Sequence, residues 1–398
     1  MRIVFFTNTI LEHGGGLEKY FIDVSSELAR RYPDDDISVV TFNERRTELL
    51  QRALSLYYVK NMPISNIYRE KTDDILRKLG RVRYVKCASF GEVRTELSRC
   101  DVIYSKNELI DLSILKWFGF KTLPPVIVGA HTPIRIPKAL SFHDRLHNSL
   151  YLGFPYRMLL RGTTAVHAIN SDDAELLKRN FGYRKVYMIL APFDSKKTVP
   201  EEPRSSDGGE FRLAFAGRLT AQKGIDILLE CIHQLSLKSV FPSLRFRLAG
   251  SGEADFVKRF ADLSETFPNV EYLGHVSSSD MDGLYRWSDI VLVPSYVETS
   301  NYVALEAGSS GRVVVASDLS GPREIVANGE TGFLVRPVAE DFVKTIEAMY
   351  ALKTDHPMEF LSIGTRAMRR IETLFSPDVI FPQLQAMFEE TCRISHVK

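Results

Sequence analysis

The chain has 398 residues, of which 44% are hydrophobic and 25% are charged, and its formal net charge is +1. This length exceeds what one ordinary hydrophobic core supports, so it predicts two domains of about 200 residues each. The balanced charge excludes a general electrostatic attraction to nucleic acid or to a membrane, and any such attraction has to come from a local patch.

The apolar runs in the sequence are short. The run within Met1–Asn8 is too short for a signal peptide and is typical of a buried first strand. No run approaches the roughly 20 residues that a membrane-spanning helix needs. We therefore expect a cytoplasmic protein, either dissolved or lying at the inner face of the membrane.

Short apolar runs alternate with longer helical patterns along the chain. Near-continuous apolar strands indicate parallel sheets covered on both faces, and the repeated strand–helix order predicts an α/β fold with doubly wound, Rossmann-like sheets. The expected strands are Ile3–Phe6, Ile37–Phe42, Val102–Tyr104, Val126–Val128, Ala165–Ile169, Val186–Leu190, Leu213–Ala216, Phe246–Leu248, Val270–Leu273, Ile290–Val293 and Val313–Ala316. The expected helices include Gly16–Arg30, Asp172–Asn180, Gly224–Gln234 and Tyr302–Ser309.

The segment Ser195–Gly209 interrupts this pattern, because it is polar, contains two prolines and ends in a glycine pair. It has the composition of a linker, so we expect an N-terminal domain at residues 1–200 and a C-terminal domain at residues 201–398. Open α/β sheets bind ligands at the carboxyl ends of their strands, which predicts a substrate cleft between two facing sheets. The helical spacing of Pro377–Glu390 predicts a closing C-terminal helix that packs on the body of the protein.

A loop that carries two cations follows the expected strand Leu213–Ala216 directly. Its sequence is Gly217-Arg218-Leu219-Thr220-Ala221-Gln222-Lys223-Gly224. The Arg218 guanidinium is a planar fork that matches phosphate oxygens, and the Lys223 ammonium adds a mobile point charge. The pair predicts a diphosphate clamp; the alternative is two solvated cations beside a turn.

Two acids, Glu298 and Glu306, stand eight residues apart after another apolar strand. Thr299 or Ser300 is expected to cap the helix that reaches Glu306, and the free N–H groups around Asn301–Val303 are expected to form an anion site. Eight helical residues span roughly 12 Å, which is on the order of the distance from a ribose to a sugar across a diphosphate. The alternative is one capping and one surface carboxylate.

His131 comes just after the expected strand Val126–Val128. This order predicts a position at the carboxyl end of an N-domain strand, facing the cleft. The alternative is a capping or core histidine.

These motifs resemble family 4 of the retaining glycosyltransferases, which have the GT-B fold. The resemblance is strong over about 213–335 and weaker over the first 195 residues, which form the acceptor-binding half in that family. Besides the two cations and the two acids, it rests on Gly15-Gly16-Leu17-Glu18, Ala249-Gly250-Ser251-Gly252-Glu253, Gly274-His275-Val276, Ser288-Asp289, Pro294-Ser295, Gly321-Pro322-Arg323-Glu324-Ile325-Val326 and Gly332-Phe333-Leu334-Val335.

The resemblance implies a glycosyltransferase with a nucleotide-sugar donor. Arg218 and Lys223 would bind the diphosphate. Glu306 would bind the ribose hydroxyls and Glu298 the hydroxyls of the donor sugar, while His131 would contact that sugar and help to stabilise charge. The other donor-binding residues that it implies are Gly15, Gly16, Gly217, Gly250, Gly252, Val276, Ser300, Asn301 and Tyr302.

The resemblance also implies a mechanism with retention of configuration. The anomeric C–O bond breaks, and the cations stabilise the charge that develops on the departing diphosphate. No cofactor and no metal are then expected, and the donor is a UDP-, GDP- or ADP-sugar. Ser300 and Asn301 depart from the family, which usually has an aromatic or small residue and then glycine there.

The expected acceptor is a glycan or a lipid-linked glycan, as in polysaccharide biosynthesis, and no nucleic-acid partner is expected. The segment Arg135–Arg161 is basic and carries aromatic residues. It predicts peripheral contact with anionic lipid headgroups; the alternative is a solvated face of snorkelling arginines.

Two other functions fit the same sequence features. A nucleotide-sugar epimerase on the same scaffold would release the nucleotide without an acceptor. A catalytically silent sugar-nucleotide-binding protein is the other alternative, and the residues Ser300 and Asn301 are its main support.

Overall fold

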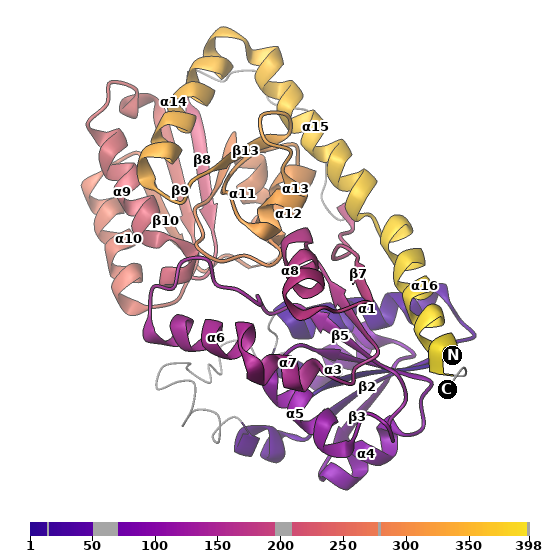
Figure 1. Cartoon of the computed structure of the whole chain (residues 1–398). Helices are drawn as coiled ribbons and strands as arrows, with labels where there is room; N and C mark the ends of the chain where they lie inside the picture. Colours follow the sequence, from indigo (N-terminus) through magenta and orange to yellow (C-terminus); the bar gives the residue numbers. More distant parts are fainter. Residues whose placement is uncertain (14–15, 51–70, 196–208, 278–279, 396–398) are drawn as a thin grey trace. The chain divides into compact units, whose positions relative to one another are not determined.

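The computed structural model of the chain describes residues 1–13, 16–50, 71–195, 209–277 and 280–395. The chain divides into two compact units (Figure 1). The first unit consists of Met1–Ile189 together with Phe381–Lys398, and the second consists of Leu190–Ile380.

The first unit is built on a seven-stranded sheet. Its strands are β1 (Arg2–Thr7), β2 (Asp36–Phe42), β3 (Arg83–Cys87), β4 (Val102–Lys106), β5 (Val126–Ala130), β6 (Ala165–Ala168) and β7 (Val186–Met188). The helices that connect them are η1 (Leu11–His13), α1 (Gly16–Arg31), α3 (Thr72–Leu79), α4 (Phe90–Leu97), α5 (Leu109–Phe118), α6 (Phe142–Leu152), α7 (Phe154–Leu160) and α8 (Ser171–Phe181). The strand order is β3-β2-β1-β4-β5-β6-β7.

The second unit is built on a six-stranded sheet. Its strands are β8 (Phe211–Ala216), β9 (Leu244–Ala249), β10 (Val270–Gly274), β11 (Ile290–Val293), β12 (Val313–Ser317) and β13 (Gly332–Val335). Its helices are η4 (Ala221–Lys223), α9 (Ile225–Ser236), η5 (Phe241–Ser243), α10 (Ala254–Thr266), α11 (Met281–Trp287), α12 (Tyr302–Ser309), α13 (Ser320–Ile325), α14 (Ala339–Asp355) and α15 (Pro357–Phe375). The strand order is β10-β9-β8-β11-β12-β13.

Every strand pair in the described parts of both sheets is parallel. In each sheet the order runs outward in both directions from the first strand, β1 or β8. Right-handed crossovers that start from such a central strand place helices on both faces. The doubly wound α/β architecture predicted from the alternating pattern is therefore confirmed.

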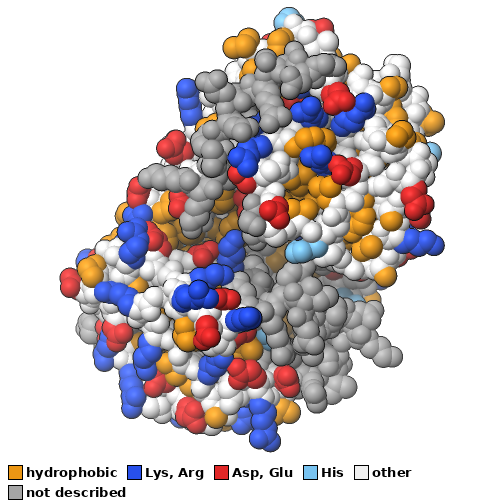
Figure 2. Space-filling model, turned by 180° about the vertical axis from the view of Figure 1, so that it is seen from behind, with side chains coloured by type: hydrophobic (Ala, Val, Ile, Leu, Met, Phe, Trp, Pro, Cys, Tyr) orange, Lys and Arg blue, Asp and Glu red, His pale blue; other side chains and the backbone are white. Residues whose placement is uncertain are grey.

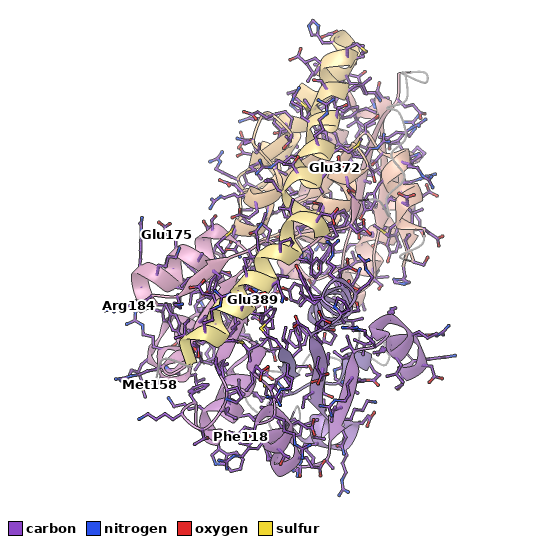
Figure 3. All side chains as sticks on the ribbon, turned by 90° about the vertical axis from the view of Figure 1, so that its right-hand side faces the viewer. Phe118, Met158, Glu175, Arg184, Glu372 and Glu389 are labelled. Atoms are coloured by element: carbon purple, nitrogen blue, oxygen red, sulfur yellow. The ribbon has the colours of Figure 1, made fainter. Side chains whose placement is uncertain are left out.

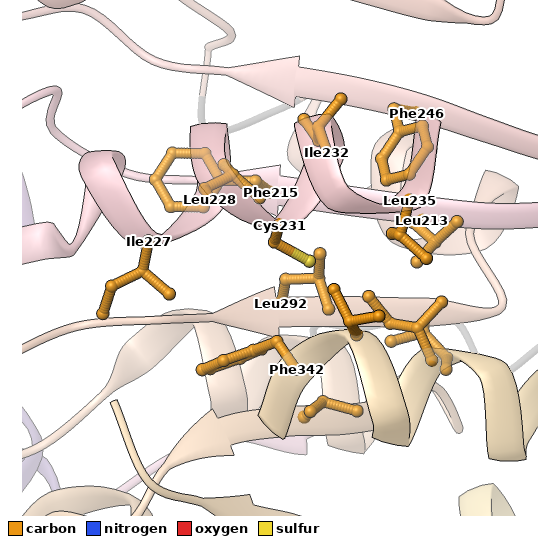
Figure 4. Close-up of a cluster of buried hydrophobic side chains, with 14 of the residues drawn as sticks. Leu213, Phe215, Ile227, Leu228, Cys231, Ile232, Leu235, Phe246, Leu292 and Phe342 are labelled. Carbon is orange, nitrogen blue, oxygen red and sulfur yellow. The ribbon is translucent and has the colours of Figure 1, made fainter. Parts of the chain in front are cut away.

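One hydrophobic cluster of the second unit lies between its sheet and the helices α9 and α14 (Figure 4), and a second one includes residues of α11, α12 and α15. Helix α9 buries its apolar side chains against the sheet, while its charged residues are exposed. Full burial of one such side chain contributes about 1.5–3 kcal/mol. The buried residues labelled in the figure are Leu213, Phe215, Ile227, Leu228, Cys231, Ile232, Leu235, Phe246, Leu292 and Phe342.

The C-terminal helix α16 (Pro377–Ser395) forms as predicted, but most of it belongs to the first unit rather than to the expected C-terminal domain. Its buried Phe388 ring lies 6.1 Å from the Phe5 ring and 5.9 Å from the Tyr104 ring, measured between centroids. The apolar face of α16 therefore packs against β1 and β4. Figure 3 shows this helix in yellow, with Glu389 labelled on it.

The expected linker and the boundary after residue 200 fall within 196–208, which lie outside the described residues. Two strands that the sequence reading missed, β3 and β13, form the edges of their sheets. The strand β3 has charged residues at its first and fourth positions, and β13 begins at a glycine. The charged residues shorten the apolar run of β3, and the three apolar residues of β13 were not recognised as a strand.

Lysine, arginine and acidic side chains are intermingled over the face seen in Figure 2, in keeping with the net charge of +1. Within the part of the chain that the structure describes, no helix combines the length and the apolar character that crossing a bilayer requires.

Candidate functional site

The predicted phosphate- and sugar-binding residues of the second unit follow the carboxyl ends of neighbouring strands. Arg218 follows β8, Gly250 follows β9, and Glu298 follows β11. The strands are parallel neighbours in the order β9-β8-β11, so these three loops emerge at one edge of the sheet. Such an edge is where open α/β sheets bind ligands.

Close backbone contact joins the loop after β8 to the loop after β11. Gly224 has a φ of +66°, and a Cβ there would lie 1.9 Å from the Pro294 carbonyl oxygen. The Tyr296 N–H donates to the Gln222 carbonyl oxygen at 2.8 Å. Only glycine permits this approach, and the approach brings Lys223 to the acid that follows β11.

Lys223 and Glu298 form an ion pair, with Nζ 2.7 Å from Oε1. The Ser295 hydroxyl donates to the same carboxylate oxygen at 2.7 Å. The Glu298 side chain is only 6% exposed, whereas that of Lys223 is 26% exposed. The acid is therefore held from two sides, while the ammonium group keeps two further N–H donors and access to solvent.

Arg218 is exposed, and its side chain makes no hydrogen bond or ion pair with any residue that the structure describes. The predicted partnership of Arg218 with Lys223 thus consists of a common loop and not of a contact. An exposed guanidinium with all five N–H donors available is suited to take up a phosphate group from solution.

Helix α12 has the expected bounds, Tyr302–Ser309, but its N-cap is Asn301 and not Thr299 or Ser300. Oδ1 of Asn301 accepts from the Ala304 N–H at 2.7 Å. Asparagine is one of the strongest N-cap residues, so it takes this role from the serine and threonine before it. Glu298 consequently precedes the helix, and the estimate of roughly 12 Å along eight helical residues does not apply.

Glu306 lies on α12 and accepts a hydrogen bond from the Tyr285 hydroxyl at 2.7 Å, on Oε2. Tyr285 is buried on α11, and burial together with the neighbouring carboxylate raises the pKa of its phenol. The phenol therefore stays protonated and donates a hydrogen bond to the carboxylate. This contact fixes one oxygen of the Glu306 carboxylate.

Close packing of the loops after β8 and β9 requires glycine at two positions. A Cβ on Gly250 would lie 2.0 Å from the Gly217 carbonyl oxygen, and one on Gly252 would lie 2.3 Å from the Leu219 carbonyl oxygen. Two backbones therefore touch at this edge, whatever they bind. Val276, near the end of β10, is partly buried against the neighbouring apolar cluster.

In the first unit, His131 follows β5 directly and belongs to a chain of polar groups. Its Nε2 lies 2.8 Å from the Tyr104 hydroxyl, which lies 2.7 Å from Nδ1 of His167. Nε2 of His167 lies 2.8 Å from the Ile189 carbonyl oxygen. Burial lowers the pKa of His131 well below its usual range, and the charge of His167 would lower it further.

The backbone around His131 is also held in place. The side-chain oxygen of the buried Asn107 accepts from the N–H groups of His131 and Thr132, at 3.1 and 2.9 Å. Of the two glycines expected near a phosphate, Gly16 is exposed at the start of α1, and Gly15 lies outside the described residues.

The sequence matches known proteins in two ways. The sequence model of the family described as "Glycosyl transferases group 1" matches residues 210–352. D-inositol 3-phosphate glycosyltransferase from Pseudarthrobacter chlorophenolicus is 30% identical over 375 residues, which cover 90% of this chain and 86% of the relative.

The chain belongs to the group 1 glycosyltransferases.

The protein of the same name from Corynebacterium diphtheriae is 25% identical to this glycosyltransferase over 86% of this chain and 82% of the relative. Solved structures are also similar. HepE of Anabaena in complex with UDP and glucose has a TM-score of 0.69 at 19% identity and covers 98% of this chain and 100% of its own. Sucrose-phosphate synthase of Thermosynechococcus elongatus has a TM-score of 0.72 at 17% identity, with 98% of both chains covered. These likenesses confirm the GT-B architecture.

The sequence of this group 1 glycosyltransferase assigned no role to several polar residues that hold these side chains in place. In the second unit they are Ser295 and Tyr285, which hold the two acids. In the first unit they are Tyr104 and His167, which end or interrupt apolar strands. A polar residue inside a buried strand was the available signal, because its side chain needs a hydrogen-bond partner.

Proposed function

We propose that this protein transfers a sugar from a nucleoside diphosphate sugar to a glycan or lipid-linked acceptor, with retention of the anomeric configuration. The observation that carries the proposal is the Lys223–Glu298 pair at 2.7 Å, at the carboxyl edge of the second sheet, in which Lys223 shares its loop with the exposed Arg218. An anion site and a hydroxyl-binding acid thus adjoin each other, as a nucleotide-sugar requires.

The cations act on the leaving group. As the anomeric C–O bond breaks, negative charge develops on the diphosphate and positive charge on the sugar ring. Arg218 offers a bidentate fork, and Lys223 retains N–H donors beyond the one that it gives to Glu298. Because both are held on a loop before the reaction starts, their stabilisation costs little reorganisation.

The acids act on hydroxyl groups. Glu298 has a second oxygen besides the one that Lys223 and Ser295 contact, and we assign it to the donor sugar. Glu306 has one oxygen bound by Tyr285, and we assign the carboxylate to the ribose. In the first unit, we assign His131 to the donor sugar as well. Retention of configuration rests on the resemblance to family 4.

The similar proteins support the donor and widen the range of acceptors to test. Related structures have been determined with UDP and with UDP-glucose, and the curated relatives carry the name D-inositol 3-phosphate glycosyltransferase. A cyclitol phosphate therefore joins the glycan and lipid-linked acceptors as a substrate class to be tried.

A two-step experiment tests the proposal. A thermal-shift screen against UDP-, GDP- and ADP-sugars identifies the donor, because a ligand that binds only the folded state raises the melting temperature. Transfer is then measured by mass spectrometry with D-inositol 3-phosphate and with glycan acceptors. Acceptor-dependent product with unchanged rate in EDTA is expected. Nucleotide release without an acceptor would favour an epimerase, binding without turnover would favour a silent protein, and loss of activity in EDTA would contradict the metal-free mechanism.

We also propose peripheral contact with an anionic membrane through α6 and α7. Phe142 is 68% exposed and Phe154 is 73% exposed, and Arg145 and Arg157 on the same helices are exposed. Exposed aromatic rings among cations suit a lipid interface. Co-sedimentation with phosphatidylglycerol vesicles, but not with phosphatidylcholine vesicles, is expected for the wild type and not for the Phe142→Ser, Phe154→Ser variant. Equal sedimentation of both proteins would contradict this contact.

A further inference from the structure

His131, Tyr104, His167 and the Ile189 carbonyl group are linked by successive hydrogen bonds. The last of these bonds determines which group donates in each of the others. The Ile189 carbonyl oxygen can only accept, so Nε2 of His167, 2.8 Å away, has to donate. His167 is fully buried, and burial lowers its pKa to about 4. The ring therefore carries a single proton near neutral pH, on Nε2, and its Nδ1 is an acceptor.

The direction continues outward through Tyr104. Burial raises the pKa of its phenol, so the hydroxyl keeps its one proton. That proton goes to Nδ1 of His167, 2.7 Å away, because this nitrogen has none of its own. The Tyr104 oxygen then has to accept from Nε2 of His131, 2.8 Å away.

The position of the proton on His131 follows from these hydrogen bonds. His131 is only partly exposed, burial keeps its ring neutral, and its one proton is on Nε2. Its Nδ1 is left as a lone-pair acceptor, which makes no hydrogen bond with any residue of the described ranges. The Tyr20 ring lies against the imidazole, with centroids 4.2 Å apart, and restrains its orientation.

The hydrogen bond between Tyr104 and His131 requires a glycine at position 129. A Cβ on Gly129 would lie 2.3 Å from the Tyr104 hydroxyl oxygen and 2.6 Å from Nε2 of His131. Any other residue there would displace the hydrogen bond between the two side chains. Asn107 fixes the His131 backbone at the same time, so both ends of this histidine are held.

We propose that Tyr104 and His167 are positioning residues that hold His131 as a neutral hydrogen-bond acceptor for a hydroxyl group of the sugar substrate. The inference rests on the proposed transfer of a sugar, in which it assigns His131 to a sugar hydroxyl and not to the diphosphate. A nitrogen lone pair attracts an O–H group and repels an anionic oxygen. His131 therefore contributes selectivity for the carbohydrate part and no positive charge.

Nuclear magnetic resonance of the free protein with ¹⁵N-labelled histidine tests the hydrogen-bond direction. Loss of one signal in His131→Asn assigns this ring among the nine histidines. The wild type is expected to show a proton on Nε2 of both His131 and His167, in slow exchange with water. In Tyr104→Phe the His131 N–H signal is expected to broaden by exchange, while the His167 signal persists because its Ile189 partner remains.

A proton on Nδ1 of His131 in the wild type, or an unchanged His131 signal in Tyr104→Phe, would overturn the inference. The wild-type spectrum decides even where the variant fails to fold. Tyr183→Phe is the matched control, since it removes another phenol of the first unit that donates to a backbone carbonyl, that of Leu160 at 2.8 Å. Because these spectra need no substrate, their outcome is independent of whether the protein transfers sugar.

An activity measurement completes the test. Tyr104→Phe is expected to lower kcat about tenfold with the donor KM changed less than about twofold, and Tyr183→Phe to remain near the wild type. His131→Asn, whose side-chain oxygen can replace the Nδ1 acceptor, is expected to retain more activity than His131→Ala. Equal loss in these two variants would contradict the acceptor role, even where the spectra agree.

Discussion

Lys223 and Glu298 lie 75 residues apart in the sequence, yet the ammonium nitrogen of one is 2.7 Å from a carboxylate oxygen of the other. A cation assigned to the diphosphate and an acid assigned to the sugar therefore neutralise each other in the protein. The Glu298 carboxylate is nearly buried, whereas the Lys223 ammonium group reaches solvent. Loss of its partner would therefore cost more free energy for the carboxylate than for the ammonium group.

Removing the lysine is expected to destabilise the second unit. Lys223→Ala leaves the buried Glu298 carboxylate with only the Ser295 hydroxyl among the partners named, at a cost of about 1–2 kcal/mol in the free energy of unfolding. The double variant Lys223→Ala, Glu298→Gln is expected to recover most of that loss. Urea denaturation provides the measurement. Lys238→Ala is the control, because its pair with Glu347 at 3.5 Å is exposed and contributes about 0.5 kcal/mol or less.

Arg218 is expected to matter for activity and not for stability. Its exposed side chain makes no hydrogen bond or ion pair with the described residues, so Arg218→Ala should change the unfolding free energy by less than about 0.5 kcal/mol. The same variant should lower kcat/KM at least about 100-fold, and Arg218→Lys should fall between, because a point charge replaces a fork. Arg259→Ala, at another exposed arginine, is the control. Turnover like that of the wild type in Arg218→Ala would reject the clamp.

The hydrogen bond from Tyr285 to Glu306 is expected to contribute to nucleotide affinity. Tyr285→Phe releases the carboxylate that we assign to the ribose, and we expect a Kd for the nucleotide about tenfold higher, with kcat at saturating donor unchanged. Glu306→Ala should weaken binding further. Isothermal titration calorimetry measures both, with Tyr350→Phe as a control on α14. An unchanged affinity of Glu306→Ala would contradict the ribose role.

Acid should destabilise the first unit through His167. The pKa of this histidine is about 4 in the folded protein, against a usual 6.5, so between these pH values the unfolded chain binds a proton that the folded chain does not. Its contribution to stability is therefore lost as the pH falls from 6.5 to 4, by about 3 kcal/mol.

The measurement for His167 is a difference between variants. Burial raises the pKa of Asp111 and Asp173, and these groups act in the opposite direction, but they are common to the wild type and to His167→Gln. Urea denaturation at pH 7 and pH 4 should therefore reveal a steeper acid loss in the wild type. The exposed His233→Gln should follow the wild type, and parallel losses in all three proteins would refute the prediction.

The fold was largely predictable because most of the central strands contain a short apolar run. The strands β11 and β12 are buried along their whole length, and the expected ranges Ile290–Val293 and Val313–Ala316 match them within one residue. Two of the four edge strands, β3 and β13, were missed, because charged residues interrupt β3 and β13 is short and begins at a glycine. The unit to which α16 belongs was missed because a helical stripe reveals that a face is buried but not what buries it.

The location of a candidate site residue was predictable where it depends only on the order of residues and strands in the sequence. A residue that follows a parallel strand lies at the carboxyl edge of the sheet, and this position was correctly predicted for Arg218, Lys223 and Glu298. The partners of these residues come from elsewhere in the chain, and no local pattern connects Tyr285 to Glu306. The N-cap of α12 was misplaced because three successive residues can all cap a helix.

The first unit takes its residues from both ends of the sequence, whereas the second is a single uninterrupted stretch. During translation, the whole of Leu190–Ile380 leaves the ribosome before the segment from Phe381 onward, which supplies the Phe388 ring to the core beside Phe5. The second unit can thus fold while the first still lacks its last helix. A released chain that ends at Ile380 is accordingly expected to hold a protease-resistant second unit next to a first unit that is still readily cleaved.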